Sequence, residues 1–212
     1  MKWENFVNKF AELPVIDTEL MLAGVKDSKP VKVQISRWRK SGKLFQLKRG
    51  FYVLSKTYRK TSLFEPYISF LLKKPSYLSL EKALEYHGLI PEGVPVYTAV
   101  TSKRAAKFSS EIGVFTYRHI KQSLFWGYES VTLNSQTGFI AFPEKALLDL
   151  VYLHGMNISL EYFEGLRLQH VDKLNPAILF KFAAKFKSLG MQRVASVIVK
   201  YIEDYKKSEK QL

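Results

Sequence analysis

The sequence contains no cysteine among its 212 residues. A chain without cysteine forms no disulfide, thiolate zinc site or cysteine nucleophile, and its composition suits a reducing cytoplasm. No apolar run approaches the roughly 18 to 20 residues that span a bilayer. The first residues, MKWENFVNKFAELP, lack the apolar core of a secretory signal peptide. The sequence therefore predicts a cytoplasmic protein with no membrane partner.

The usual signatures of enzymes and cofactor sites are also missing. The sequence has no G-x-x-x-x-G-K-[ST], no G-x-G-x-x-G, no H-E-x-x-H and no G-x-S-x-G. Its four histidines are dispersed and form no pair at metal-ligand spacing. His87 and His154 each precede a glycine at the expected end of a helix, where capping of carbonyl groups explains them. We expect no catalytic residue, no cofactor and no metal, hence a protein that is not an enzyme.

One pair of carboxylates, Glu144 and Asp149, is a candidate for acid–base chemistry. Glu144 and Asp149 lie in the segment PEKALLDL, which is expected to be helical. A spacing of five places them on different faces of a helix, and an acid in the first turn is favoured by the helix dipole. We therefore expect both residues to have structural roles.

Acidic residues are absent from Ser28 to Phe64, although the whole chain has a net charge of +14. That window holds Lys29, Lys32, Arg37, Arg39, Lys40, Lys43, Lys48, Arg49, Lys56, Arg59 and Lys60. A basic surface attracts polyanions, so nucleic acid is the partner class that the charge indicates. Lysine and arginine also serve solubility, but soluble surfaces mix both signs of charge.

The first 60 residues have the pattern of three helices followed by a hairpin. Helical spacing runs through KWENFVNKFAEL and ends at Pro14. A short second helix follows a cap at Asp17 or Thr18, and a third helix starts near Ser28. KLFQL and GFYVL are β-prone segments joined by the turn KRG. This order is typical of a winged helix-turn-helix, whose third helix enters the major groove of DNA while the hairpin touches the backbone.

The third helix has two different faces. Val31, Ile35 and Trp38 form an apolar stripe that is expected to be buried. The predicted DNA-binding residues are Lys29, Lys32, Val33, Ser36, Arg37, Lys40, Lys43, Lys48 and Arg49. The last two lie at the hairpin turn, where a wing would meet phosphate. The alternative, a solvated basic surface, remains open at this point.

The predicted fold is α+β with two domains, residues 1–60 and 61–212. Helices are expected at FEPYISFLL, at SLEKALEYHG with Ser79 as its cap, and at PEKALLDLVYLHG. Four short strands are expected between the second and third of these helices, in VPVYTAVTS, GVFTYRHI, GYESVTL and GFIAF. Amphipathic helices are expected after residue 158, in SLEYFEGLRL, PAILFKFAAKFKSLG and QRVASVIVKYIEDYKK.

The sequence resembles the AbiEi-type antitoxins of type IV toxin–antitoxin systems, which belong to bacterial phage-defence loci. The resemblance rests on ISRWRKSGKLFQLKRGFYVL, YLSLEKALEYHGLIPE, TAVTSKRAAKFSSEIGVFTYRHIK and GFIAFPEKALLDLVYL, in that order. It covers residues 15 to 155, about three quarters of the chain. The hairpin motif alone is shared by many regulators, whereas its combination with the later segments is more specific. The helices after residue 158 match no motif of the family.

The resemblance implies a DNA-binding autorepressor that binds operator repeats in its own promoter. It also implies an antitoxin domain that counters a nucleotidyltransferase-like toxin, without a stable direct complex. The DNA-reading residues that it implies are Lys32, Val33, Ser36, Arg37 and Lys40 on the helix, with Lys48 and Arg49 on the hairpin. An alternative from another class is a protein that binds RNA or a toxin and uses the winged helix as a platform.

Overall fold

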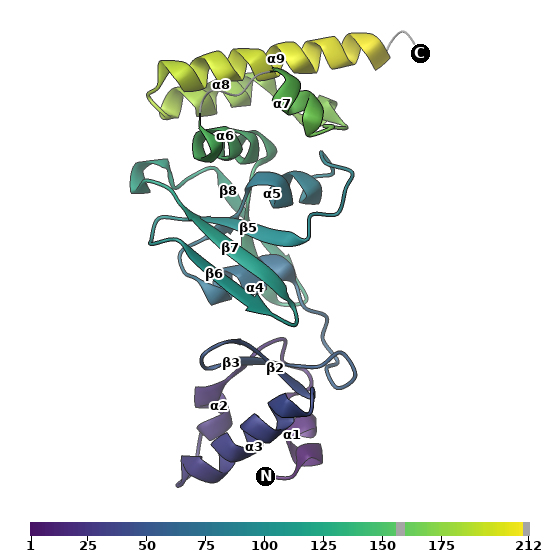
Figure 1. Cartoon of the computed structure of the whole chain (residues 1–212), viewed down its shortest axis with the longest axis vertical. Helices are drawn as coiled ribbons and strands as arrows, with labels where there is room; N and C mark the ends of the chain where they lie inside the picture. The colour runs from purple at the N-terminus through teal and green to yellow at the C-terminus, as the bar shows by residue number, and fades with distance from the viewer. Residues whose placement is uncertain (156–159, 210–212) are drawn as a thin grey trace.

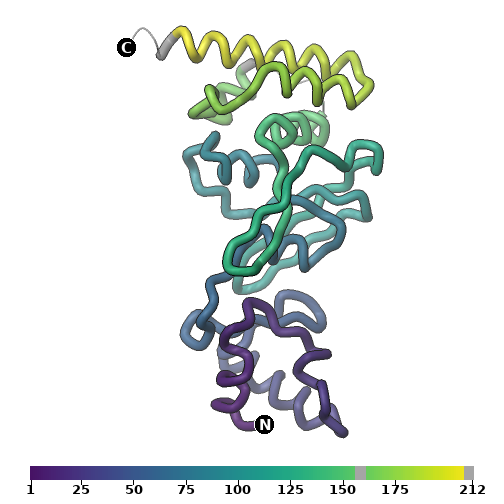
Figure 2. The backbone as a smooth tube through the Cα atoms, turned by 180° about the vertical axis from the view of Figure 1, so that it is seen from behind, coloured from purple at the N-terminus to yellow at the C-terminus, as the bar shows by residue number. Residues whose placement is uncertain are grey.

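The computed structural model describes residues 1–155 and 160–209. The elements stack along one long axis (Figure 1, Figure 2). The N-terminal helices and a small sheet form one end, a larger sheet lies in the middle, and the C-terminal helices form the other end. The fold is mixed α+β, as predicted.

The N-terminal region contains three helices and a three-stranded antiparallel sheet. Its elements are α1 (Trp3–Phe10), β1 (Ile16–Asp17), α2 (Thr18–Leu22), α3 (Ser28–Lys40), β2 (Leu44–Lys48) and β3 (Phe51–Leu54). All three helices and the hairpin match the prediction. The sheet has the order β1-β3-β2, so the strand β1, which was not predicted, pairs with β3. Gly50 has a φ of 90° in the hairpin turn, a conformation that glycine adopts without strain.

The hairpin β2–β3 is packed on both faces. Leu44 and Leu54 are paired across the strands and belong to the first core, with residues of α1, α2 and α3. On the opposite face, Leu47 and Val53 belong to the larger second core of the molecule. Side chains of a strand point alternately to its two faces, so one hairpin can line both cores.

The middle of the molecule is a mixed sheet with helices on both sides. Its strands are β4 (Tyr77–Leu78), β5 (Val96–Thr101), β6 (Ala106–Ser110), β7 (Gly113–His119), β8 (Tyr128–Leu133) and β9 (Gln136–Ala141), in the order β6-β7-β5-β4-β9-β8. Helix α4 (Glu65–Leu72) lies on the side nearer the N-terminal region, and α5 (Leu80–Tyr86) and α6 (Pro143–His154) lie on the other side (Figure 1). The four predicted strands are present; β4 and β6 were not predicted.

The C-terminal helices form a further layer beyond α6. They are α7 (Leu160–Gly165), α8 (Pro176–Lys185) and α9 (Leu189–Glu209), with a short 3₁₀ turn at Val171–Lys173 between α7 and α8; another 3₁₀ turn, Gln122–Leu124, lies between β7 and β8. All three helices were predicted. Ser159, the first residue of the segment predicted to form α7, lies outside the described residues. Leu179, Val194 and Ile198 extend the second core into this layer.

Candidate nucleic-acid interface

Helix α3 is fixed by a cap at its start and by one apolar face. Asp27 is the N-cap, and its carboxylate accepts a hydrogen bond from the backbone N–H of Lys29 at 3.0 Å. Val31, Ile35 and Trp38 are buried in the first core, as predicted. The ring of Trp38 lies 4.6 Å from that of Phe6, between centroids. This packing determines which side of the helix faces solvent.

The outward face of α3 carries the predicted contact residues. Lys29, Lys32, Val33, Ser36, Arg37 and Lys40 are all exposed. None of the cations on this face forms an ion pair within the described part of the chain. Val33 is 49% exposed and adds an apolar group to this basic face. The face is therefore positively charged and free to meet a partner.

Lys48 is placed differently from the prediction. Its ammonium donates hydrogen bonds to the carbonyl oxygens of Leu71 and Leu72, at 2.8 and 2.9 Å. These are carbonyls at the C-terminal end of α4, where the helix dipole favours a cation. Burial, followed by the charge of Lys74, lowers the pKa of Lys48. Lys48 thus attaches the hairpin to α4 rather than presenting its charge to phosphate.

The other two predicted residues of the hairpin region differ from each other. Arg49 is exposed at the turn between β2 and β3. Lys43 is half-buried, and its ammonium lies 5.2 Å from the centroid of the Trp3 ring. Arg49 is therefore the accessible cation of the hairpin, while Lys43 covers the edge of the first core.

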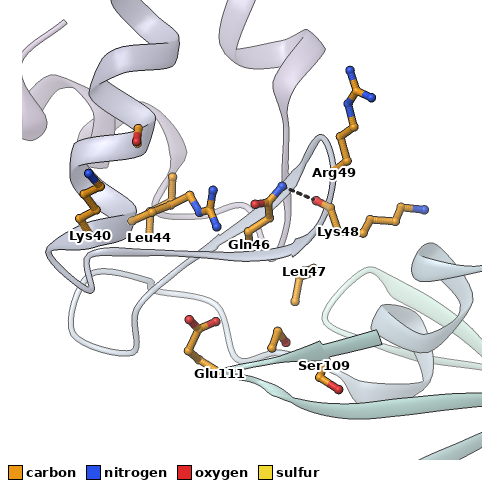
Figure 3. Close-up of a pocket in the computed structure, with 11 residues that line it drawn as sticks. Lys40, Leu44, Gln46, Leu47, Lys48, Arg49, Ser109 and Glu111 are labelled. Carbon is orange, nitrogen blue, oxygen red and sulfur yellow. Dashed lines mark hydrogen bonds between the residues drawn. The ribbon is translucent and has the colours of Figure 1, made fainter. Parts of the chain in front are cut away.

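A cleft of about 930 Å³ separates α3 and the hairpin from the turn between β6 and β7 (Figure 3). Its lining residues are Ser36, Arg39, Lys40, Leu44, Gln46, Leu47, Lys48, Arg49, Ser109, Ser110 and Glu111. Arg39 was not among the predicted contact residues, although it belongs to the acid-free segment. Its spacing of seven from Lys32 and three from Ser36 places it on the same face of the helix, so helical periodicity could have found it.

A second hollow, of about 740 Å³, lies on the other side of the hairpin turn. Its lining includes Lys32 of α3, Arg49 and two acids, Asp17 at the N-cap of α2 and Glu19 in the first turn of that helix. The predicted residues Lys32 and Arg49 are thus neighbours in space. Arg49 lines both the cleft and this second hollow, so its side chain lies between them.

The most perturbed ionisable groups lie elsewhere, inside the second core. Lys145 and Asp149 are both fully buried and form an ion pair along α6. Asp149 also accepts hydrogen bonds from Tyr77 Oη at 2.9 Å and Ser79 Oγ at 2.8 Å. Burial raises the pKa of Asp149 and lowers that of Lys145, and each charge opposes the shift of the other. With no exposed atom, this group holds the sheet to α6 and meets no solute.

This network corrects the predicted role of Ser79 and agrees with the structural roles predicted for Glu144 and Asp149. Ser79 stands at the N-cap position of α5, but its hydroxyl donates to Asp149 instead of capping that helix. Glu144 is buried, and its carboxylate accepts the backbone N–H of Asn175 at 2.8 Å, next to the start of α8. Both carboxylates have structural contacts, as predicted, and the ion-pair partner of Asp149 is Lys145.

The two histidines at helix ends contact carbonyl groups. A ring nitrogen of His154 lies 3.0 Å from the carbonyl oxygen of Leu150, one turn earlier in α6. The Nε2 of His87 lies 2.8 Å from the carbonyl oxygen of Ala141, at the end of β9. His154 therefore caps its own helix as predicted, and His87 ties α5 to the sheet.

Comparison with known proteins adds no relative. No protein-family model matches this chain, and a search of curated proteins finds no match. Within the described residues, no helix is both long enough and apolar enough to cross a bilayer. No group of three or more histidine, aspartate or glutamate side chains in the same residues is arranged to hold a metal ion.

Proposed function

We propose that the N-terminal region is a winged helix-turn-helix that binds double-stranded DNA through α3. The observation that carries the proposal is the outward face of this helix, which is basic, exposed and, among the residues that the structure describes, without ion pairs. Cations on such a face displace the counterions of the DNA backbone, which favours binding. Arg37 and Lys40 have the donors that recognise the guanine edge in the major groove. Arg49 is the cation of the wing that contacts phosphate.

We propose further that the protein is a cytoplasmic autorepressor and the antitoxin of a type IV toxin–antitoxin operon concerned with phage defence. This part rests on the resemblance of the sequence to AbiEi-type antitoxins. The segments that carry the resemblance form α3, the hairpin, α5, β5 to β7 and α6. The operator would be repeats in the promoter of the protein itself. The larger α+β region would counter a nucleotidyltransferase-like toxin without a stable complex.

The DNA-binding proposal is tested by titrating the full chain against a duplex from its own upstream region. The variant Lys32→Ala/Arg37→Ala/Arg49→Ala should bind much more weakly, and its salt dependence should be shallower by about 0.9 per lost phosphate contact. A matched control removes the same charge from the C-terminal helices, as Lys181→Ala/Arg193→Ala/Lys200→Ala; all three residues are exposed. An equal loss of DNA affinity in both triple variants would show that only the net charge of the protein matters, and not the position of the cations. Unaltered binding by the first variant would exclude α3 and the hairpin turn.

The antitoxin proposal needs a separate experiment. A nucleotidyltransferase-like reading frame next to the gene is expressed with or without this protein, and growth is recorded. Rescue of growth without co-purification is the expected result. Toxicity that persists in the presence of the folded protein would contradict the antitoxin role and leave the DNA-binding role standing.

An alternative use of the same region is as a platform for RNA or for a protein such as a toxin. It is favoured by three exposed apolar side chains in or near α2 and α3, because exposed apolar groups beside a basic face suit a protein partner. They are Leu20, Val25 and Val33, with exposed fractions of 44%, 38% and 49%. Preference for structured RNA over the upstream duplex, or stable co-purification of the neighbouring gene product, would favour this alternative.

A further inference from the structure

The cleft between the N-terminal region and the β6–β7 turn has two chemically different walls. One wall contains cations of α3 and the hairpin, namely Arg39, Lys40 and Arg49. The other wall contains Ser109, Ser110 and Glu111. In Figure 3 the carboxylate of Glu111 points from the turn toward the α3 side of the cleft. The walls belong to segments about 60 residues apart in sequence, so the fold alone brings them together.

Apart from Lys48, which donates to the carbonyl oxygens of Leu71 and Leu72, the charged groups that line this cleft have no ion-pair partner in the described residues. Neither the three cations nor Glu111 takes part in an ion pair there. The amide nitrogen of Gln46 is used, because it donates to the carbonyl oxygen of Lys48 at 3.2 Å (Figure 3). Its side-chain oxygen is left to accept a hydrogen bond. Leu44 and Leu47 also line the cleft, although they are only 1% and 3% exposed.

We propose that this cleft binds a free nucleoside phosphate. Phosphate oxygens are suited to the guanidinium of Arg39 and the ammonium of Lys40. A carboxylate such as Glu111 accepts hydrogen bonds from ribose hydroxyls or from an amino group of a base. A volume of about 930 Å³ lies within the range of small-molecule sites and accommodates a mononucleotide.

The carboxylate distinguishes a nucleotide from other anions. Glu111 is the one acid in the lining of this cleft. A duplex backbone or an inorganic polyphosphate would place negative charge against both walls and be repelled by Glu111. A nucleoside phosphate carries its negative charge at one end and hydrogen-bond donors at the other, so it matches both walls. The second domain thus supplies the part of the site that recognises the neutral end of the ligand.

The site has a regulatory consequence that rests on the proposed function. Ser36 and Lys40 line the cleft and also belong to the outward face of α3. A nucleotide bound there occupies groups that contact DNA, so ligand and operator compete. By linkage, a ligand that binds only the DNA-free protein weakens DNA binding to the extent that it saturates the site. The nucleotide would therefore act as an inducer of the operon.

The test uses the full-length chain and calorimetric titration with ATP, GTP and inorganic tripolyphosphate, without metal ions. Arg39→Ala should weaken binding of both nucleotides about tenfold, the effect of losing one charged hydrogen bond. Glu111→Gln should weaken the nucleotides about tenfold and should strengthen tripolyphosphate, because a repulsive charge is removed. The matched controls Arg193→Ala and Glu203→Gln, both exposed on α9, should change neither.

Several results would overturn the proposal. One is that neither ATP nor GTP binds at about 1 mM, a concentration at which a specific site should be occupied. Another is a Glu111→Gln variant that strengthens nucleotides and tripolyphosphate alike, which would reduce the cleft to a general anion site. Binding of a short single-stranded RNA in the absence of mononucleotide binding would assign the cleft to a strand instead.

The outcome can be separated from that of the DNA-binding proposal. Operator binding by a protein that ignores nucleotides would leave the repressor and remove the inducer site. Nucleotide binding that responds to Arg39 and Glu111, in a protein that binds no DNA, would do the reverse. Where both occur, added nucleotide should release the operator from the wild-type protein and should do so about tenfold less effectively from Glu111→Gln.

Discussion

The lysine side chains of helices α3 and α6 lie in opposite environments. On α3 the cations are exposed and have no ion pair in the described chain, whereas Lys145 of α6 is fully buried against Asp149, Tyr77 and Ser79. An enclosed charge must be satisfied by the protein itself, because burial without a partner is very costly. An exposed cation has no such requirement and is available to a polyanion. The structure thus separates charges that maintain the fold from charges that are available for binding.

The largest expected effect comes from breaking the enclosed pair. Lys145→Ala leaves Asp149 buried without its counter-ion and should lower the free energy of unfolding by about 3 to 5 kcal/mol. Urea denaturation at neutral pH measures this loss. The matched change on the exposed helix, Lys32→Ala, should shift stability by less than about 0.5 kcal/mol. Equal stability of the two variants would contradict the closed environment of Lys145.

Next in size is the effect of removing Arg37, the residue of α3 that is proposed to read a base. Arg37→Ala should weaken operator binding by about 1 to 3 kcal/mol and relax specificity at one position, if Arg37 reads a guanine edge. The midpoint of urea denaturation should remain that of the wild-type protein, because Arg37 is exposed. Fluorescence anisotropy with single-base operator variants measures both affinity and specificity. Uniform weakening across all sequences would instead make Arg37 a phosphate contact.

A smaller effect on stability is expected at Lys48. Lys48→Ala removes the two hydrogen bonds to the end of α4 and should cost about 1 to 2 kcal/mol in the free energy of unfolding. Its effect on the salt dependence of DNA binding should be small, because the ammonium is committed to carbonyl groups. Chemical denaturation and a salt titration of binding give the two values. If Lys48→Ala made the salt dependence of DNA binding shallower and left the free energy of unfolding unchanged, Lys48 would instead be a phosphate contact.

The smallest effect is expected at the neighbouring residue, Arg49. Arg49→Ala should leave stability within about 0.5 kcal/mol of the wild-type value. It should reduce the slope of log affinity against log salt by about 0.9, which corresponds to one phosphate contact. Lys48 and Arg49 are adjacent in sequence, so this pair of variants tests the separation of the two kinds of charge within a single turn. Identical behaviour of the two would remove that distinction.

Caps and apolar spacing within short segments were sufficient to predict most helices and strands. The features that the sequence did not predict depend on contacts between residues far apart in the chain. The cap at Asp27 and the spacing of Val31, Ile35 and Trp38 were sufficient to define α3 and its two faces. Two-residue strands such as β4 have too little sequence to show a period. The position of Lys48 depends on carbonyls 23 and 24 residues away, which no local pattern reveals.

The residues of the candidate site also fall into a group that local sequence patterns predict and a group that depends on distant contacts. The exposed cations of α3 followed from helical periodicity, because the apolar stripe determines the opposite face. The contribution of Glu111 to the cleft could not be predicted, since it requires the β6–β7 turn to face a hairpin more than 60 residues earlier. The partners of Asp149 were missed for a similar reason, because Tyr77 and Ser79 come from a different part of the chain.

The hairpin β2–β3 contributes to two cores at once, Leu44 and Leu54 to one and Leu47 and Val53 to the other. Neither core is complete without it, so melting of either one exposes apolar surface of the other. Heat or denaturant should therefore unfold the chain in one cooperative transition rather than in two separate steps. A fragment that stops at residue 60 would expose one apolar side of its own sheet to water. Helix α3 and the larger region should therefore unfold together, so a substitution that destabilises one region also destabilises the other.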